Sequence, residues 1–248
     1  MDAVYTIWLR NMKRYLRSKS RIFGSLGQPL FFLLLLGYGL SSFSIPGLGQ
    51  NYQVFIVPGI IAMTVMFTSI FSGIQIIWDK QFGFLKETLI APVSRNAIML
   101  GQTLGGATTA ILQGLLIFFL SILIVGFRPT LPGIAICIGF MALIGISLTA
   151  FGIAIASKMD DMQGFQLIMN FVLFPIFFSS GAVFPIDNAP EILKVIAHLN
   201  PLTYGVEGIR YGLFGASQIN PILCFAVLAG FSAAMVMAGG LLFRKVKV

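Results

Sequence analysis

Six long apolar runs without an ionisable residue constrain this chain more than any other feature of its sequence. A helix that crosses a bilayer needs about 20 mostly apolar residues. Only 10% of the residues are charged, whereas soluble domains carry about 25%. The sequence therefore predicts an all-α polytopic membrane protein with six transmembrane helices in one domain, residues 22–248. The expected spans are residues 22–43, 54–78, 101–127, 133–157, 164–184 and 221–243.

Basic residues are distributed unevenly between the two sides that six spans define. Thirteen of the sixteen Lys and Arg residues lie on the side that holds both chain ends, and only Arg128, Lys194 and Arg210 lie on the other. Because cytoplasmic loops of membrane proteins carry the excess of Lys and Arg, we expect both termini in the cytoplasm. The net charge of +8 is then explained by membrane anchoring, and no nucleic acid partner is expected.

Residues 1–21 precede the first span and have a two-sided pattern. On a helix, five basic residues fall within an arc of about 100°. Apolar and aromatic residues fill the opposite side, which predicts an amphipathic helix in the cytoplasmic interface. An ordinary basic flank that happens to be helical is the alternative. The basic set is Arg10, Lys13, Arg14, Arg17 and Arg21, and the apolar set is Val4, Ile7, Trp8, Met12, Tyr15 and Leu16.

The connection between the second and third spans, residues 79–100, has the mixed character of a structured cytoplasmic loop. Residues 84–90 can form a short helix, and Pro92 ends it because the residue before a proline is pushed out of the α region. Ser94 can cap the next helix, which continues through Arg95 into the third span. We therefore expect a short rigid helix that protrudes from the membrane on the cytoplasmic side.

The connection at residues 185–220 faces outward but is too apolar for a solvated loop. Asn200-Pro201 divides it into two half-apolar segments, near residues 190–198 and 202–215, which we expect to be short re-entrant helices. Such backbone is tolerated where protein buries it or where it lines a cavity. Glu207 and Arg210 have i, i+3 spacing on the second segment and can pair. They are either a structural pair or a polar lining at an outer exit.

The sequence lacks the motifs of most enzymes and ion-coupled transporters. It contains no P-loop, no H-E-x-x-H and no G-x-S-x-G, so we expect no ATP site, metal site or catalytic centre on this chain. Proton- and ion-coupled transporters usually place ionisable residues at membrane depth, and these spans have none. Asp160 and Asp161 form either a solvated turn or part of a docking surface for a cytoplasmic partner. Transport driven through the cytoplasmic loops by a separate motor fits best.

Three groups of residues, in order along the chain, resemble the ABC-2 type export permeases. They are residues 82–89 with Ala-Pro-Val-Ser-Arg at 91–95, residues 180–185 with Asn200-Pro201-Leu202-Thr203 and Arg210, and the basic N-terminus leading to Gln28-Pro29-Leu30. The resemblance implies a type V exporter fold in a prokaryotic cell membrane. Two six-span permeases, either two copies or a copy and a paralogue, would pair in the bilayer above two ABC ATPase subunits. ATP and Mg would bind those ATPase subunits.

The resemblance also implies roles for individual residues and a class of substrate. The approach to the first span, residues 24–29, resembles the drug- and lipid-exporting branch, such as daunorubicin-type permeases and nodulation-factor exporters. It implies outward movement of an amphipathic, drug-like or lipid-linked substrate by alternating access; a polysaccharide exporter and a stand-alone secondary transporter or channel are the alternatives. The implied ATPase-coupling residues are Phe84, Leu85, Lys86, Glu87, Thr88, Leu89, Pro92, Ser94, Arg95, Asp160 and Asp161, and the implied outer gate is Pro185, Asn200, Pro201, Glu207 and Arg210.

Overall fold

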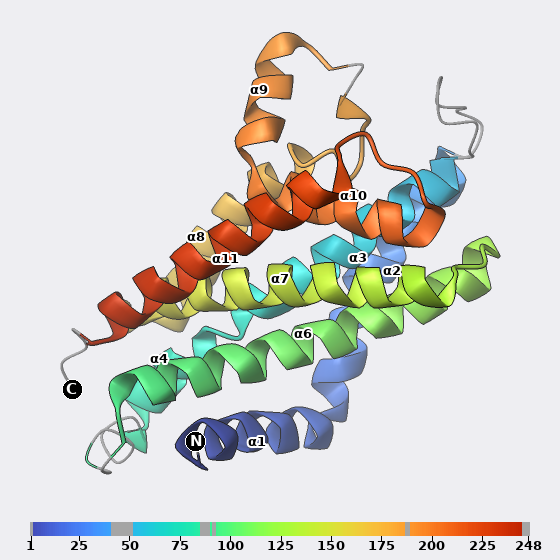
Figure 1. The fold of residues 1–248 in the computed structure, drawn as a ribbon. Coiled ribbons are helices and arrows are strands. Elements are labelled where there is room, and N and C mark those ends of the chain that lie inside the picture. The colour runs from blue at the N-terminus through green and yellow to red at the C-terminus, as the bar shows by residue number, and fades with distance from the viewer. Residues whose placement is uncertain (1, 41–51, 85–89, 91–92, 187–188, 245–248) are drawn as a thin grey trace.

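The computed structural model describes residues 2–40, 52–84, 90, 93–186 and 189–244, and the regular structure in these residues is entirely helical (Figure 1). The helices are α1 (Asp2–Arg17), α2 (Lys19–Gly39), α3 (Tyr52–Phe71), α4 (Ile74–Gln81), α6 (Arg95–Val125), α7 (Leu131–Ala156), α8 (Met162–Phe178), α9 (Glu191–Leu199), α10 (Pro201–Phe214) and α11 (Pro221–Arg244).

Within the described residues, five helical stretches are long and apolar enough to cross a membrane. They are α2, the α3–α4 pair, α6, α7 and α11. The chain is therefore a multi-pass, all-helical membrane protein. The expected fifth span corresponds to α8, an apolar helix of 17 residues that is shorter than the other spans.

The chain after α8 turns back onto α3 and does not continue as a helix to residue 184. Gly181 adopts a positive φ of 71°, which glycine adopts without steric cost. The Tyr52 hydroxyl then donates to the Val183 carbonyl at 2.9 Å. A Cβ atom at Gly59 would lie 2.4 Å from the Ala182 carbonyl oxygen, so only glycine permits this close approach. These contacts explain why the helix ends earlier than its apolar composition predicts.

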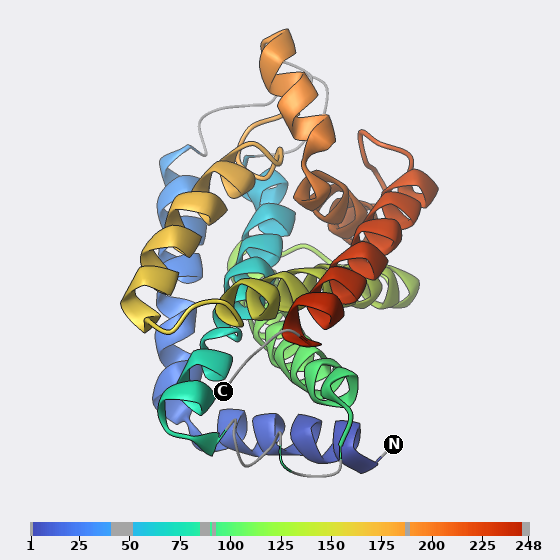
Figure 2. The same ribbon diagram turned by 90° about the vertical axis from the view of Figure 1, so that its left-hand side faces the viewer.

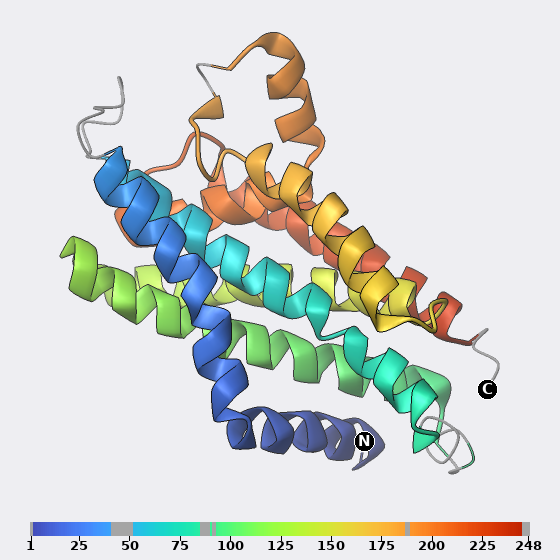
Figure 3. The same cartoon turned by 180° about the vertical axis from the view of Figure 1, so that it is seen from behind.

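The expected second span is divided into α3 and α4 at residues 72–73. The Ser72 hydroxyl donates to the Ser69 carbonyl at 2.6 Å, which draws one acceptor away from the regular helical pattern. Gly73 lies against Gly152 of α7, where a Cβ atom would be 2.7 Å from the Gly152 carbonyl carbon. The break changes the course of the chain, and α4 continues separately to residues 82–84 (Figure 3).

Glycines also set the position of α10. Gly205, Gly208 and Gly212 form one stripe along it, and a Cβ atom at any of them would collide with α7, at 2.2 Å from the Phe140 ring in the case of Gly208. The helix is therefore buried against α7, with ten buried residues. By contrast, α9 protrudes from the molecule (Figure 1), and Ala197 is its one buried residue.

The helix ends gather into two groups. One end of the bundle, here called the basic end, holds α1, the C-terminal end of α4, the first turn of α6, residues 157–161 and the last turn of α11 (Figures 1 and 2). Hydrogen bonds join these parts, since Arg95 Nη1 donates to the Arg244 carbonyl at 2.5 Å. The other end, here called the opposite end, holds residues 126–130, the start of α3 and α9. Thus α1 and the end of α11 lie on the same side of the bundle.

Candidate functional site

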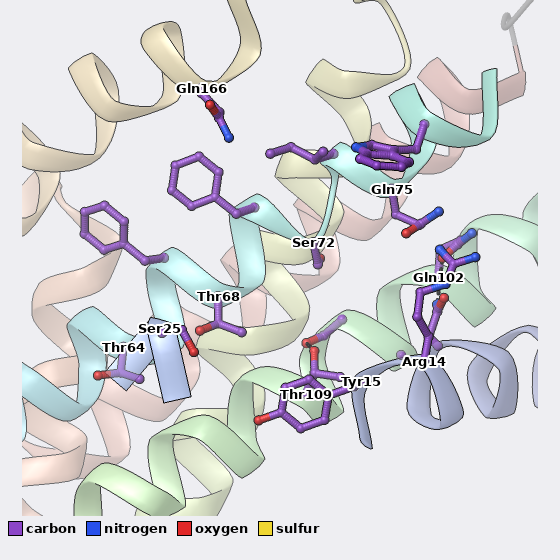
Figure 4. Close-up of a pocket in the computed structure, with 18 of the residues that line it drawn as sticks. Arg14, Tyr15, Ser25, Thr64, Thr68, Ser72, Gln75, Gln102, Thr109 and Gln166 are labelled. Atoms are coloured by element: carbon purple, nitrogen blue, oxygen red, sulfur yellow. Dashed lines mark hydrogen bonds between the residues drawn. The ribbon is translucent and has the colours of Figure 1, made fainter. Parts of the chain in front are cut away.

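A cavity of about 1160 Å³ opens between α1, α2, α3, α4, α6 and α8 (Figure 4). Its lining combines uncharged polar groups with aromatic rings, and its charged residues are Arg14 and Asp79. The other principal lining residues are Tyr15, Ser25, Gln28, Thr64, Phe67, Thr68, Phe71, Ser72, Gln75, Trp78, Gln102, Thr109, Gln166, Asn170 and Phe174.

Helical spacing produces the polar wall of this cavity. Thr64, Thr68, Ser72 and Gln75 recur every three or four residues, so they lie on one face of the α3–α4 pair. Figure 4 shows their side chains along the course of these helices, with Gln166 reaching in from α8. Such a wall offers hydrogen bonds to a solute without placing a charge in the membrane.

Aromatic rings form the apolar wall. Phe67 and Phe174 pack edge to face with ring centroids 5.6 Å apart, and Phe71 packs against Phe165 in the same way at 6.4 Å. These pairs place α3 and α8 side by side at a favourable aromatic separation. A lining that is partly aromatic and partly hydrogen-bonding suits an amphipathic molecule.

An ion pair lies beside the cavity at the basic end. Arg10 Nη2 of α1 lies 2.9 Å from Asp79 Oδ2 of α4, and Gln75 donates to the other carboxylate oxygen at 2.6 Å. The Asp79 side chain is 4% exposed, so its charge is compensated by Arg10 and not by water. The pair links α1 to α4.

The face of α1 opposite its basic residues packs on α6 through two glycines. A Cβ atom at Gly101 would lie 2.8 Å from Ile7 Cβ, and one at Gly105 would lie 2.5 Å from Asn11 Nδ2. This close approach allows polar contacts between the helices: Asn11 donates to Gln102 at 2.7 Å, and Trp8 to Thr108 at 3.0 Å.

The last turn of α1 continues this packing and points into the cavity. The Tyr15 hydroxyl donates to Gln113 Oε1 at 2.5 Å. Burial raises the pKa of Tyr15, which keeps the hydroxyl protonated as a donor. The N-terminal helix is amphipathic as the sequence predicts, but its apolar face is covered largely by protein, since Ile7 and Tyr15 are both buried.

The α4 helix is also tied to the turn between α7 and α8. Lys80 Nζ donates to the Ser157 carbonyl at 2.6 Å and the Met159 carbonyl at 3.2 Å, and it lies 3.2 Å from Asp160 Oδ1. Gln81 donates to the Asp160 carbonyl at 2.7 Å. The two segments that the sequence predicts to be cytoplasmic, residues 79–95 and 160–161, are therefore in contact through Lys80 and Gln81.

The residues of the expected coupling segment are only partly within the described chain. Leu85, Lys86, Glu87, Thr88, Leu89 and Pro92 lie outside the described residues. Phe84 is 53% exposed. Ser94 accepts a hydrogen bond from the Ala97 amide at 3.2 Å and caps α6, as the sequence predicts. Asp161 caps α8 by accepting from the Gly164 amide at 2.6 Å.

The expected gate residues lie toward the opposite end of the bundle. Glu207 and Arg210 form a buried ion pair, with 0% and 3% of their side chains exposed. Arg210 also donates to the Gly181 carbonyl at 3.2 Å and lies over the Phe55 ring at 4.4 Å, while Glu207 accepts from the Gln218 amide at 2.6 Å. The pair therefore joins α10 to α3, to the segment that follows α8 and to the loop before α11.

Asn200 and Pro201 connect α9 to α10. Asn200 Oδ1 accepts from the Leu202 amide at 3.0 Å and caps α10, and Pro201 occupies the first turn, where it has no amide hydrogen to satisfy. Asn200 Nδ2 donates to the Ile176 carbonyl of α8 at 2.6 Å. The break at this dipeptide agrees with the sequence, and Pro185 is partly buried.

A family model, that of the ABC-2 type transporters, matches residues 2–214. The chain belongs to the ABC-2 type transporter family. It is 30% identical over 232 residues to ycf38 of Cyanophora paradoxa, a protein named as a transport permease, and the match covers 88% of this chain and 80% of that protein. It is 26% identical to the inner membrane transport permease YadH of Escherichia coli K12, and the match covers 94% of this chain and 91% of that protein. It is 25% identical to nodulation protein J of Sinorhizobium fredii, covering 96% and 92%.

The family assignment confirms the resemblance seen in the sequence. ABC-2 permeases have no catalytic site of their own. In this ABC-2 chain, the described residues include no cluster of His, Cys, Asp and Glu suited to a metal ion.

Sequence reasoning missed the cavity of this ABC-2 permease and the partnership of Arg10 with Asp79. The cavity residues come from six helices, so no local motif identifies them. A signal for Asp79 was present, because a lone carboxylate at the end of an apolar span requires a partner. Its partner lies 69 positions away and could not be chosen among six N-terminal basic residues.

Proposed function

We propose that this chain is the permease subunit of an ATP-driven ABC exporter, which moves an amphipathic, drug-like or lipid-linked substrate outward. The observation that carries the proposal is the cavity of about 1160 Å³, whose wall next to the basic end is bonded to the segments that a cytoplasmic ATPase would contact. The family assignment supports an ABC ATPase as the partner that supplies energy. ATP and Mg would bind that subunit.

The hydrogen-bonded contacts at the basic end suggest how the ATPase acts on the cavity. Movement of residues 84–95 reaches α4 directly, and α4 carries Asp79 and Lys80. Asp79 passes the displacement to α1 through Arg10, and Lys80 passes it to the turn before α8. Because α1, α4 and α8 all line the cavity, one displacement would change three of its walls.

Two permease copies in one bilayer are part of the proposal, and unpaired polar groups support it. Gln28 on α2 and Gln166 and Asn170 on α8 are exposed, and in the described part of the chain they form no hydrogen bond. All three amides line the cavity, on its α2 and α8 walls. A second copy, or a paralogous permease, placed against α2 and α8 would cover them and complete the conduit. In this arrangement the chain has six spans, with α8 as the fifth, and both termini are cytoplasmic.

Variants of the coupling segment test the proposal. Glu87→Ala or Arg95→Ala should lower both transport and transport-stimulated ATP hydrolysis of the complex, while the protein still inserts in the membrane and elutes as a single species. Arg128→Ala, in the short connection at the opposite end, is the control for loss of a positive charge. Full transport by the coupling variants would refute the coupling role.

A cavity-filling variant tests the conduit separately. Thr68→Trp places a large side chain in the cavity and should lower transport severalfold, with ATP hydrolysis in the absence of substrate unchanged. Leu123→Trp is the matched control, because Leu123 is 80% exposed and lies outside the cavity lining. Equal transport by both variants would show that substrate does not pass this cavity.

A further inference from the structure

The bend between α1 and α2 forms a groove that the proposed mechanism does not use. Ser18 interrupts the helix with φ −96° and ψ 72°, and the groove lies on the basic side of the bend. Its lining contains five cations and no acidic residue. These basic-groove residues are Arg10, Lys13, Arg14, Arg17, Ser18, Lys19 and Ser20.

Three of the cations are available to a ligand. Lys13, Arg17 and Lys19 are exposed, and within the described residues they make no hydrogen bond or ion pair. Ser18 precedes α2 but its side chain caps no amide of the first turn. The cations and the uncapped helix start both favour an anion at the bend.

Apolar side chains next to the basic groove indicate which kind of anion fits. Leu16 is 59% exposed and Phe23 is 71% exposed, one on each side of the bend. A small soluble anion would leave both in water. An anionic amphiphile would place its headgroup on the cations and its chains on the apolar side chains, as in interfacial helices that bind anionic lipids.

The basic groove also adjoins the cavity. Arg14 lines both, and Gly24 and Ser25, in the second turn of α2, line the cavity. The one carboxylate in the cavity lining, Asp79, is already paired with Arg10, so its charge would not repel an anion. A headgroup in the basic groove would thus lie at the mouth of a chamber with aromatic walls.

We infer that the basic groove receives the phosphate-bearing headgroup of an anionic membrane amphiphile whose chains extend into the cavity. The groove is then the entrance by which such molecules reach the transport pathway from the cytoplasmic leaflet. This assignment of a substrate class rests on the proposed function, but the binding itself requires neither ATP nor a partner.

The two tryptophans of the chain, Trp8 and Trp78, provide a direct test. Trp78 lines the cavity and neighbours Asp79, so Trp8→Phe leaves one fluorescent reporter inside it. The full chain is reconstituted in vesicles of phosphatidylcholine containing phosphatidylglycerol brominated on its acyl chains, or brominated phosphatidylcholine at the same mole fraction. We expect brominated phosphatidylglycerol to quench Trp78 at severalfold lower mole fraction.

Matched variants then locate the binding. Lys13→Gln with Arg17→Gln should remove most of this preference, since each cation near a membrane surface is worth up to about fivefold in affinity for anionic lipid. Lys158→Gln, an exposed cation at the same end but outside the basic groove, should keep it. Equal quenching by both lipids, or a preference unchanged in the groove variant, would overturn the inference.

Two further measurements distinguish an anionic lipid from other ligands of the basic groove. Loss of the preference on adding millimolar inorganic phosphate would show a site for a free anion and would overturn the lipid assignment. A groove variant that keeps the preference but no longer co-purifies with the ATPase would show a protein-docking surface instead. An intact lipid preference without transport would refute the proposed function and leave the binding site standing.

Discussion

The two ends of the bundle each hold an acid–base pair, and the two pairs are built differently. At the basic end, Arg10 of α1 meets Asp79 of α4 across 69 positions, with Arg10 34% exposed. At the opposite end, Glu207 and Arg210 are three positions apart on α10, and both are buried. The first pair connects two helices that line the cavity, whereas the second is formed within one helix.

This difference indicates different tasks. A contact between separate helices breaks when they move apart, and water can reach Arg10 when it does. The Glu207–Arg210 pair keeps its partners together whatever α10 does as a whole, and it also binds the Gly181 carbonyl and the Gln218 amide. We interpret the pair at the basic end as the adjustable contact and the pair at the opposite end as a fixed brace.

The largest effect is expected from Glu207→Ala, which leaves the Arg210 charge buried without its partner. Breaking a buried pair from one side costs about 3–5 kcal/mol. The melting temperature of the detergent-purified protein should fall strongly, while Glu191→Ala on the exposed α9 should leave it unchanged. The double variant Glu207→Leu with Arg210→Met should be more stable than Glu207→Ala. A melting temperature unaffected by Glu207→Ala would contradict the role of a brace.

The next largest effect is expected from Gly101→Leu, which pushes α1 away from α6. Overpacking of a close contact costs about 1–3 kcal/mol, and the displacement should also separate Arg10 from Asp79. Thermal unfolding measures the stability, and the distance between spin labels on α1 and α4 measures the displacement. Gly27→Leu is the control, because a Cβ atom there meets nothing within 4 Å. Equal melting temperatures for both variants would argue against close packing.

A smaller effect on stability is expected at the Arg10–Asp79 pair. A double-mutant cycle with Arg10→Gln and Asp79→Asn should give a coupling energy of about 1 kcal/mol, because the pair is partly exposed. The same variants should reduce transport far more than they reduce stability. A much larger coupling energy, with transport unchanged, would contradict the interpretation of Arg10–Asp79 as the adjustable contact.

The smallest effect is expected from Asp160→Asn. The Asp160 side chain is 88% exposed, and exposed ion pairs are typically worth below about 1 kcal/mol. Lys80 retains its bonds to the Ser157 and Met159 carbonyls in this variant. The melting temperature should shift slightly at low salt and not at high salt, because salt screens exposed charges. A large shift that persists in high salt would mean that Asp160 supports the turn in another way.

Local features of the fold were predictable from the sequence wherever neighbouring residues decide them. Ser94 was predicted to cap the helix that became α6, and Asn200-Pro201 was predicted to break the chain, which it does at the start of α10. The division of the second span at residues 72–73 was not, since both halves are apolar and the break depends on Gly152 of another helix. The length of α8 was mispredicted because its end is set by contacts of residues 179–186 with α3.

In the candidate site, too, contacts between neighbouring residues were predictable from the sequence and contacts between distant residues were not. The sequence placed residues 79–95 and Asp160-Asp161 at one end, but it did not show that Lys80 joins them. It identified Glu207 with Arg210, whose spacing on one helix is enough to reveal them, and it missed Arg10 with Asp79.

By itself the sequence determined that this is a multi-pass helical permease of the ABC-2 family, because span length, charge distribution and short motifs are properties of neighbouring residues. Only the tertiary structure decided where the cavity lies, which basic residue neutralises Asp79 and that the basic groove adjoins the cavity at Arg14. Those features depend on glycine contacts that bring distant helices within a side chain's reach, and the position of a glycine in the sequence does not say which helix will approach it.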